Sequence, residues 1–296
     1  MPEPHRLPDD LRGRPFTVAE ALEQGVPGTR LRRSDLAAPF HAVRRPVEMS
    51  GWYSDCLAYA AKMPAAWTFS HITAARIHGI PLPARLEEDP RVHVTALGQR
   101  APRGVGVAGH TTQRIPQVRL SKGVRVTSAV RTWTDLAPQL SLDELVIAGD
   151  RLLGIPTPLA TVDDILREVG EHATRRGQRL LVHASGLVRP GSRSPRESRT
   201  RLALLRAGLP EPELNARIVL PRRTIHGDLV YRERRVLLEY EGDQHRTDSR
   251  QWSHDLGRYN DLAEAGWLVI RISRATSDAE VVARAARALA SGGRTP

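Results

Sequence analysis

The sequence contains a single cysteine, Cys56, among 296 residues. One thiol excludes an intramolecular disulfide and any zinc cluster built on several cysteines. Aromatic residues make up only 4% of the chain, which argues against a stacking platform for single-stranded nucleic acid. No apolar run approaches the roughly 20 residues needed to span a bilayer, and the amino terminus lacks an apolar signal core. These absences predict a soluble, cytoplasmic protein with no membrane partner.

Lysine is scarce as well. Lys62 and Lys122 are the only two, so arginine supplies nearly all of the 44 basic residues. The formal net charge of +11 favours a polyanionic partner, and nucleic acid is the first choice. A GC-rich genome also produces arginine-rich chains. The distribution favours a binding role, because residues 189–236 hold twelve arginines against five acids, and a planar guanidinium donates two hydrogen bonds at once to a phosphate.

The first 50 residues predict a winged helix-turn-helix module. Thr17 and Glu20 form a capping box that begins a helix, and a turn at residues 25–28 ends it. A second short helix over residues 29–36 and an extended segment over residues 40–47 follow. Such a module can place its second helix in a major groove. Its candidate nucleic-acid contacts are Arg30, Arg32, Arg33, Arg44 and Arg45.

Residues 51–188 predict a middle α/β region. The pattern indicates helices over residues 51–62, 70–79, 128–137, 161–175 and 178–185, with strands over 91–95, 104–110 and 124–127. Four histidines suggest a metal site, but no spacing between them suits a compact ligand pair. We therefore expect structural or surface roles for His71, His78, His93 and His110. The Pro, Gly and Ser residues of segment 187–194 predict a linker and a domain boundary near residue 190.

Residues 189–296 predict an α/β domain with the order helix 195–207, strands 215–220, 226–231 and 235–241, helix 249–265, strand 267–272 and helix 278–290. A turn at residues 232–234 would bring Asp228 opposite Leu238 and Glu239, roughly 5 Å away. Glu239 and Glu241 share a face, because strand side chains alternate. Acids at the end of an apolar strand need a compensating charge, which a divalent cation with oxygen ligands supplies.

Several segments of this domain carry a recognisable order of motifs. They are Ser-Pro-Arg-Glu-Ser at 194–198, Gly-Leu-Pro-Glu-Pro at 208–212, the Asp228 strand, Glu-Tyr-Glu-Gly at 239–242 followed by His245, a helix with Asp255 and Arg258, and Ala-Gly-Trp-Leu-Val-Ile-Arg at 265–271. This order resembles the PD-(D/E)XK nuclease superfamily, and within it a bacterial domain family of unassigned function related to the very-short-patch-repair endonucleases.

The resemblance implies a restriction-endonuclease-like α/β domain in which Asp228 and Glu239 bind Mg²⁺ or Mn²⁺ and Glu197 supports them. One position departs from the pattern. The lysine of the superfamily, two residues after the second acid, is Glu241 here. The group that orients water or offsets transition-state charge is therefore open, with His245, Gln244 and Arg258 as alternatives.

The regions before residue 189 resemble the AbiEi-type antitoxins of abortive-infection systems, the N-terminal module more closely than the rest. Together the patterns predict an α/β (α+β) multidomain protein, divided at 1–50, 51–188 and 189–296, that hydrolyses duplex DNA and holds phosphates with Arg222 and Arg223. The alternative is a non-enzymatic DNA-binding transcriptional regulator of the antitoxin type with a degenerate nuclease domain, acting with a partner toxin or as a homodimer. A third possibility is an adaptor whose basic face binds a protein or RNA.

Overall fold

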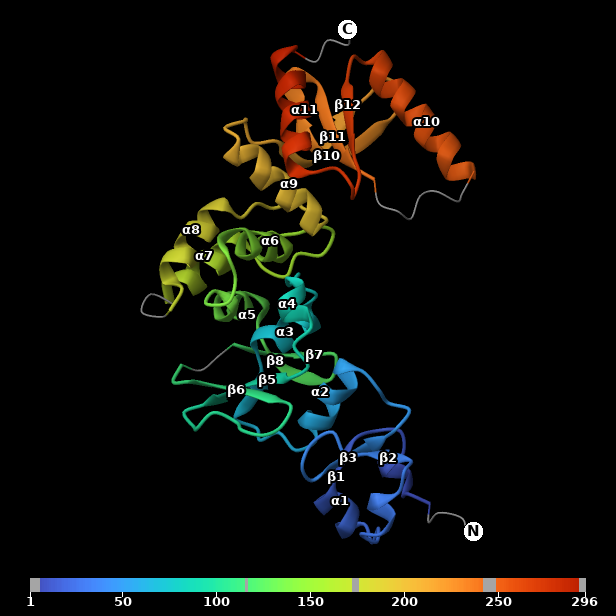
Figure 1. Cartoon of the computed structure of the whole chain (residues 1–296), viewed down its shortest axis with the longest axis vertical. Helices are drawn as coiled ribbons and strands as arrows, with labels where there is room; N and C mark the ends of the chain where they lie inside the picture. Colours follow the sequence, from blue (N-terminus) through green and yellow to red (C-terminus); the bar gives the residue numbers. More distant parts are fainter. Residues whose placement is uncertain (1–5, 115–116, 172–175, 242–248, 293–296) are drawn as a thin grey trace. The chain divides into compact units, whose positions relative to one another are not determined.

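The chain divides between Gln139 and Leu140 into two units, drawn in Figure 1 from a computed structural model. The structure describes residues 6–114, 117–171, 176–241 and 249–292, and for residues 249–256 it describes the backbone alone. Both units combine helices with sheets, which confirms the mixed α/β composition. Among the described residues, no helix is long and apolar enough to cross a membrane.

The first unit begins with a small sheet in the order β1-β3-β2. The predicted capping box is confirmed: the Thr17 hydroxyl accepts a hydrogen bond from the Glu20 amide, and the Glu20 carboxylate accepts one from the Thr17 amide. The elements of this part are η1 (Asp9–Leu11), β1 (Phe16–Thr17), α1 (Val18–Glu23), η2 (Arg30–Arg32), β2 (Leu36–Ala37) and β3 (Val43–Pro46).

The second helix expected over residues 29–36 is wrong, because only the three-residue 3-10 helix η2 forms there. Arg30 supplies the physical reason. Its buried guanidinium donates two hydrogen bonds to the Asp35 carboxylate, at 2.9 Å and 2.6 Å. Helix neighbours lie three or four positions apart, so a pair five apart does not suit an α-helix. The ion pair stabilises a tighter, irregular turn instead.

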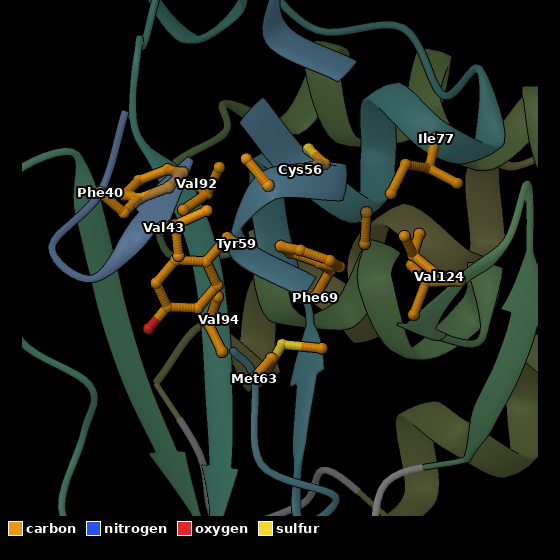
Figure 2. Close-up of a cluster of buried hydrophobic side chains, with 13 residues drawn as sticks. Phe40, Val43, Cys56, Tyr59, Met63, Phe69, Ile77, Val92, Val94 and Val124 are labelled. Carbon is orange, nitrogen blue, oxygen red and sulfur yellow. The ribbon is translucent and has the colours of Figure 1, made fainter. Parts of the chain in front are cut away.

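A five-stranded sheet in the order β6-β5-β4-β8-β7 forms the rest of the first unit. Figure 2 shows its core, in which Phe40 and Val43 pack in one cluster with Tyr59 and Phe69. Residues on both sides of the boundary expected at residue 50 therefore share a core. The elements are α2 (Trp52–Ala60), β4 (Trp67–Phe69), α3 (His71–His78), α4 (Ala84–Glu87), β5 (Val92–Leu97), β6 (Val107–Thr112), β7 (Val118–Ser121), β8 (Val124–Thr127) and α5 (Ala129–Leu136).

The second unit begins with three helices, α6 (Leu142–Leu152), α7 (Val162–Glu171) and α8 (Gln178–Leu187). Helix α6 packs against α9 (Pro195–Arg206) as well as against α8. The contacts cross the predicted linker: Asp150 of α6 accepts a hydrogen bond from the Arg189 amide at 2.7 Å and pairs with Arg201 of α9. The boundary expected near residue 190 thus lies inside this unit, and the division into three domains stays a prediction.

A four-stranded sheet in the order β12-β11-β10-β9 completes the second unit. Alternate strand residues face two helical layers. Leu229 and Leu238 pack with α9 and α11, whereas Val230 and Leu237 pack with Leu262 of α10. Figure 1 shows α10 and α11 on opposite faces of this sheet. The predicted order of elements is confirmed: β9 (Glu213–Val219), β10 (Thr224–Tyr231), η3 (Arg232–Arg234), β11 (Val236–Tyr240), α10 (Ser249–Glu264), β12 (Leu268–Ile272) and α11 (Asp278–Ala290).

Candidate active site

Polar residues form a row across the second sheet. Leu229 pairs with Leu238 in the antiparallel ladder of β10 and β11, so the same register places Asp228 opposite Glu239. Glu239 in turn pairs with Arg271 of the parallel strand β12. Residues that face each other in register point to the same side of a sheet. The hairpin predicted from the sequence is therefore present, and it brings the two acids together on the side of the sheet that α10 covers.

Asp228 and Glu239 are both largely removed from water. The Asp228 carboxylate accepts a hydrogen bond from the Tyr240 amide at 2.9 Å. Burial raises the pKa of Asp228, while this amide and the nearby Arg258 and Arg193 oppose the shift. Burial also raises the pKa of Glu239; Arg258 lowers it and the negative charge of Asp228 raises it further. The sheet thus holds two carboxyl groups whose ionised forms lack full compensation.

The two carboxylate oxygens of Glu239 differ in their hydrogen bonds. Its side chain is 6% exposed. Oε1 accepts a hydrogen bond from Arg258. Oε2 is buried and has no hydrogen-bond partner within 3.5 Å among the described residues, although the Tyr259 hydroxyl lies near enough to lower the pKa of Glu239. A buried carboxylate oxygen without a partner costs free energy. Such an oxygen suits a ligand that arrives from outside the chain.

Glu197 reaches this region from the first turn of α9. Its carboxylate accepts hydrogen bonds from the Ser194 hydroxyl at 2.9 Å, the Arg193 amide at 2.9 Å and the Asn215 side-chain amide at 2.7 Å. Burial raises the pKa of Glu197 most, and the negative charge of Asp228 raises it further. The hydrogen bond from the Arg193 amide lowers it. These contacts give Glu197 a capping role at the helix start, and they hold its carboxylate near Asp228.

Asn215 links Glu197 to the row and was missed by the sequence analysis. It lies on β9 between residues that pair with Gly227 and Leu229, so it faces Asp228. Its backbone has a φ of 45°, a left-handed conformation that asparagine tolerates better than most residues. The Asn215 Oδ1 atom is buried and has no partner in the described part of the chain. The available signal was an asparagine within the strand pattern of residues 213–219, where a polar, turn-favouring residue is uncommon.

Glu241, at the superfamily lysine position, is engaged elsewhere. Arg271 forms an ion pair with it, and the Tyr259 hydroxyl lies 3.4 Å from Oε1. The Arg271 guanidinium also lies over the Tyr259 ring, 5.0 Å from its centroid. Arg258 of α10 is the cation that contacts Glu239, and it also donates to the His226 carbonyl at 3.1 Å. Of the three proposed lysine substitutes, Arg258 lies at the acids, while Gln244 and His245 are outside the described residues.

The acids fit a magnesium ion better than a metal that needs a protein cage. Within the described residues, no group of three or more His, Cys, Asp or Glu side chains is arranged to hold a metal. Asp228 and Glu239 supply two carboxylates, one with an oxygen that has no partner. Magnesium is commonly bound through one or two carboxylates, with water and substrate phosphates completing its octahedron. Asp228 and Glu239 are therefore the type of protein ligand that magnesium commonly uses.

The arginines expected to contact nucleic acid fall into two groups. Arg44 donates to the carbonyls of Leu31 and Val43, and Arg45 pairs with Asp55. Arg30, Arg44 and Arg45 thus all have partners within the chain, and their contact with nucleic acid stays a prediction.

The second group is more accessible. Arg32 and Arg33 are exposed. Arg222 and Arg223 both pair with Asp261 of α10, and the Arg222 side chain is 70% exposed. These four remain candidates for phosphate contacts.

Three of the four histidines form a cluster in the first unit. The His71 and His110 rings stack with centroids 3.6 Å apart. His93 lies 3.2 Å from Asp89 through Nε2 and 3.1 Å from His110 Nε2 through Nδ1. An ionised Asp89 accepts a hydrogen bond from the Nε2–H of His93. The neutral ring of His93 then carries no proton on Nδ1, so Nδ1 accepts a hydrogen bond from the Nε2–H of His110. Burial lowers the pKa of all three imidazoles, to about 4 for His110. The cluster is a neutral, structural one, in line with the expected role.

This cluster predicts that the first unit loses stability in mild acid. A base whose folded pKa is depressed protonates first in the unfolded chain, so stability falls from about pH 6.5, the unfolded pKa, toward pH 4. We expect a loss on the order of 2–3 kcal/mol from His110 over this range. Urea denaturation of wild type and His110→Gln at pH 7 and pH 4.5 measures it. His183→Gln on the exposed face of α8 is the control. An unchanged pH slope in His110→Gln would refute the assignment.

The chain is similar to two curated proteins, the uncharacterized proteins MT2308 and Rv2248 of Mycobacterium tuberculosis. Each is 27% identical over 219 residues, covering 68% of this chain and 72% of the relative. No protein-family model matches. Among solved structures, the Rv2827c protein of Mycobacterium tuberculosis aligns over 71% of this chain and 85% of its own, with 14% identity and a TM-score of 0.42. That score is too low to support an argument about fold or function.

Proposed function

We propose that the second unit is a metal-dependent nuclease that hydrolyses phosphodiester bonds in DNA. The observation that supports this most directly is the acid pair on adjacent strands, with Glu239 Oε2 buried and lacking a partner among the described residues. An oxygen so placed is costly in the free protein unless a cation binds it. The resemblance to the PD-(D/E)XK nucleases predicts these same two acids as metal ligands, and it implies that the cation would serve phosphodiester hydrolysis.

In this proposal each residue near the acids has a distinct task. Asp228 and Glu239 would hold Mg²⁺, which would supply Lewis acidity and help to activate the nucleophile. Glu197 would accept a proton at its carboxylate, since burial raises its pKa above that of an ordinary glutamate. Arg258 and Arg193 offset negative charge beside the acids, as their effect on the Asp228 pKa indicates. Positive charge so placed stabilises a pentacoordinate phosphoryl group.

The excess of positive charge supports a nucleic-acid substrate. The chain carries +11 at pH 7, and Arg222 is largely exposed on the turn between β9 and β10. Phosphate contacts of this kind set affinity without reading sequence. We infer that the basic surface holds the DNA backbone while the acids act on one phosphodiester bond.

A second candidate is a DNA-binding regulator of the antitoxin type that has lost the chemistry. The ion pair between Arg258 and Glu239 favours it, because a guanidinium already neutralises one of the two acids. In that case the acid cluster stabilises the folded domain and has no catalytic role. The protein would then act with a partner toxin or with a second copy of the chain. The two candidates differ in whether the purified chain needs a divalent cation to act on DNA.

Incubation of the purified chain with supercoiled plasmid tests the nuclease proposal. We expect conversion to nicked and linear forms in 5–10 mM Mg²⁺ or about 1 mM Mn²⁺, concentrations that saturate typical weak magnesium sites, and no conversion when a chelator is present. The reaction is followed by gel electrophoresis after the final column step, with neighbouring column fractions as controls for a contaminant. DNA binding without cleavage in every metal would favour the regulator.

A further inference from the structure

Arg258 occupies an unusual place for a residue of a metal-dependent site. It extends from α10 to the acid row, and its Nη2 atom donates both to Glu239 Oε1 and to the carbonyl of His226. Neither of these contacts uses Nη1 or Nε. The side chain is 22% exposed, whereas that of Glu239 is 6% exposed. The guanidinium is therefore more accessible than the carboxylate with which it pairs, and one of its edges lies outside these two contacts.

Charge balance shows what this arrangement does to a cation. Asp228 and Glu239 carry two negative charges when ionised, and Arg258 returns one positive charge at the same place. A divalent ion entering beside Glu239 Oε2 would meet the guanidinium on the other oxygen of the same carboxylate. Like charges so close disfavour each other in a partly buried site. The protein alone is thus a poor ligand for the ion that its acids suit.

A bound phosphate changes the balance. It brings a negative charge and oxygen atoms, and a guanidinium pairs well with phosphate because its planar fork matches the geometry. The same phosphate supplies oxygens that magnesium prefers. Arg258 and the cation then share one anionic ligand instead of competing for one carboxylate.

We propose that Arg258 couples metal binding to nucleic-acid binding, so that the cation binds tightly only when a phosphodiester lies in the site. The proposal rests on the proposed metal-dependent function and adds its regulation. Arg258 is the element that responds to both ligands: it pairs with Glu239 in the free protein and with the phosphate in the complex. Thermodynamic linkage requires the effect to be reciprocal, so the metal tightens binding of nucleic acid by the same factor.

Calorimetric titration of Mn²⁺ into the full chain tests the coupling, with and without a saturating duplex of about 20 base pairs. Gel electrophoresis after each titration shows whether the duplex is still intact. We expect wild type to bind Mn²⁺ at least about tenfold more tightly with the duplex present, within the usual range of couplings between sites. Arg258→Gln should bind Mn²⁺ tightly without the duplex and gain less than about threefold from it. The same variant should cleave DNA more slowly, a split that a purely structural residue would not produce.

Arg232→Gln is the matched control. It removes the same charge from the second unit, but its partner is the exposed Glu213 rather than Glu239. We expect it to keep the wild-type coupling. Arg258→Lys keeps the charge and should keep weak metal binding in the absence of the duplex. If Arg258→Gln does not give a native circular dichroism spectrum, Arg258→Met, with similar length and no charge, takes its place.

The outcomes separate this inference from the proposed function. If wild type binds Mn²⁺ and the Arg258 variants show the same affinity and the same coupling, the inference is wrong and the metal site stands. If neither wild type nor the Arg258 variants bind Mn²⁺, both are wrong. If only the neutral Arg258 variants bind it, with or without the duplex, the competition is real but the natural chain is not a metal enzyme, which favours the regulator.

Discussion

Asp228→Asn and Glu239→Gln are each expected to reduce Mg²⁺-dependent DNA cleavage by a factor of about a thousand or more, the scale of removing a group that stabilises the transition state. Each substitution removes an anionic ligand and changes the side-chain volume little. Both acids already have raised pKa values through burial, so a neutral side chain in these positions does not burden the fold. We therefore expect folding to be retained while cleavage is lost.

Glu213→Gln provides the control for this experiment. Glu213 also lies in the second sheet, on β9, but it is exposed and pairs with Arg232 on the surface. We expect its cleavage rate to match that of wild type. Initial rates of plasmid nicking, measured with all four proteins purified in parallel, give the comparison. Equal rates in wild type and both acid variants would show that the activity comes from a contaminating nuclease.

The acid hairpin was predictable because its signals are local. The alternation of residues 226–231 and 235–241 fixes which side chains share a face, and the short turn between them fixes the register. Those two facts place Asp228 opposite Leu238 and Glu239, and the observed pairing of Leu229 with Leu238 selects Glu239. Helices α9 and α11 of the same unit begin at the capping residues Ser194 and Ser277, which makes their starts readable as well.

The partners of charged side chains were not predictable in the same way. Arginine can pair with any acid that the tertiary fold brings near, and a helix pattern does not say which. Arg30 was expected on an exposed helix but lies buried against Asp35. Arg258 was one of three alternatives for the lysine role, and only the packing of α10 on the sheet shows that it reaches Glu239.

Long-range contacts explain the histidine cluster too. His71 begins a helix, while His93 and His110 lie on neighbouring parallel strands, β5 and β6. No short spacing connects them, so the sequence offered only four scattered imidazoles. The fold stacks two of them and hydrogen-bonds the third to Asp89.

The buried ion pair between Arg201 and Asp150 should have the largest effect on stability. Their side chains are 0% and 1% exposed, and Arg201 also donates to Glu211 and to the Leu187 carbonyl. Burial raises the pKa of Asp150, while Arg201 opposes the shift. Removing the arginine would leave a buried acid without its counter-ion, which costs about 3–5 kcal/mol in comparable pairs.

Arg201→Met is therefore expected to lower the free energy of unfolding of the second unit by about 3–5 kcal/mol at pH 7. The loss should shrink as the pH falls, because an acid with a raised folded pKa takes up a proton in the folded state first. Asp150→Leu combined with Arg201→Met should recover most of it, since no uncompensated charge remains. Arg232→Met, which breaks the exposed pair with Glu213, should cost less than about 1 kcal/mol.

Chemical denaturation of the whole chain, with amide hydrogen exchange followed in α6 and α9, assigns the change to the second unit. The pair joins these two helices, and α9 carries Glu197 at its start. Faster exchange in both helices of Arg201→Met, restored in the double variant, would show that the segment before residue 190 belongs to the same cooperative structure as the acid site. Wild-type stability and unchanged exchange in Arg201→Met would mean that the ion pair contributes nothing to the stability of the second unit.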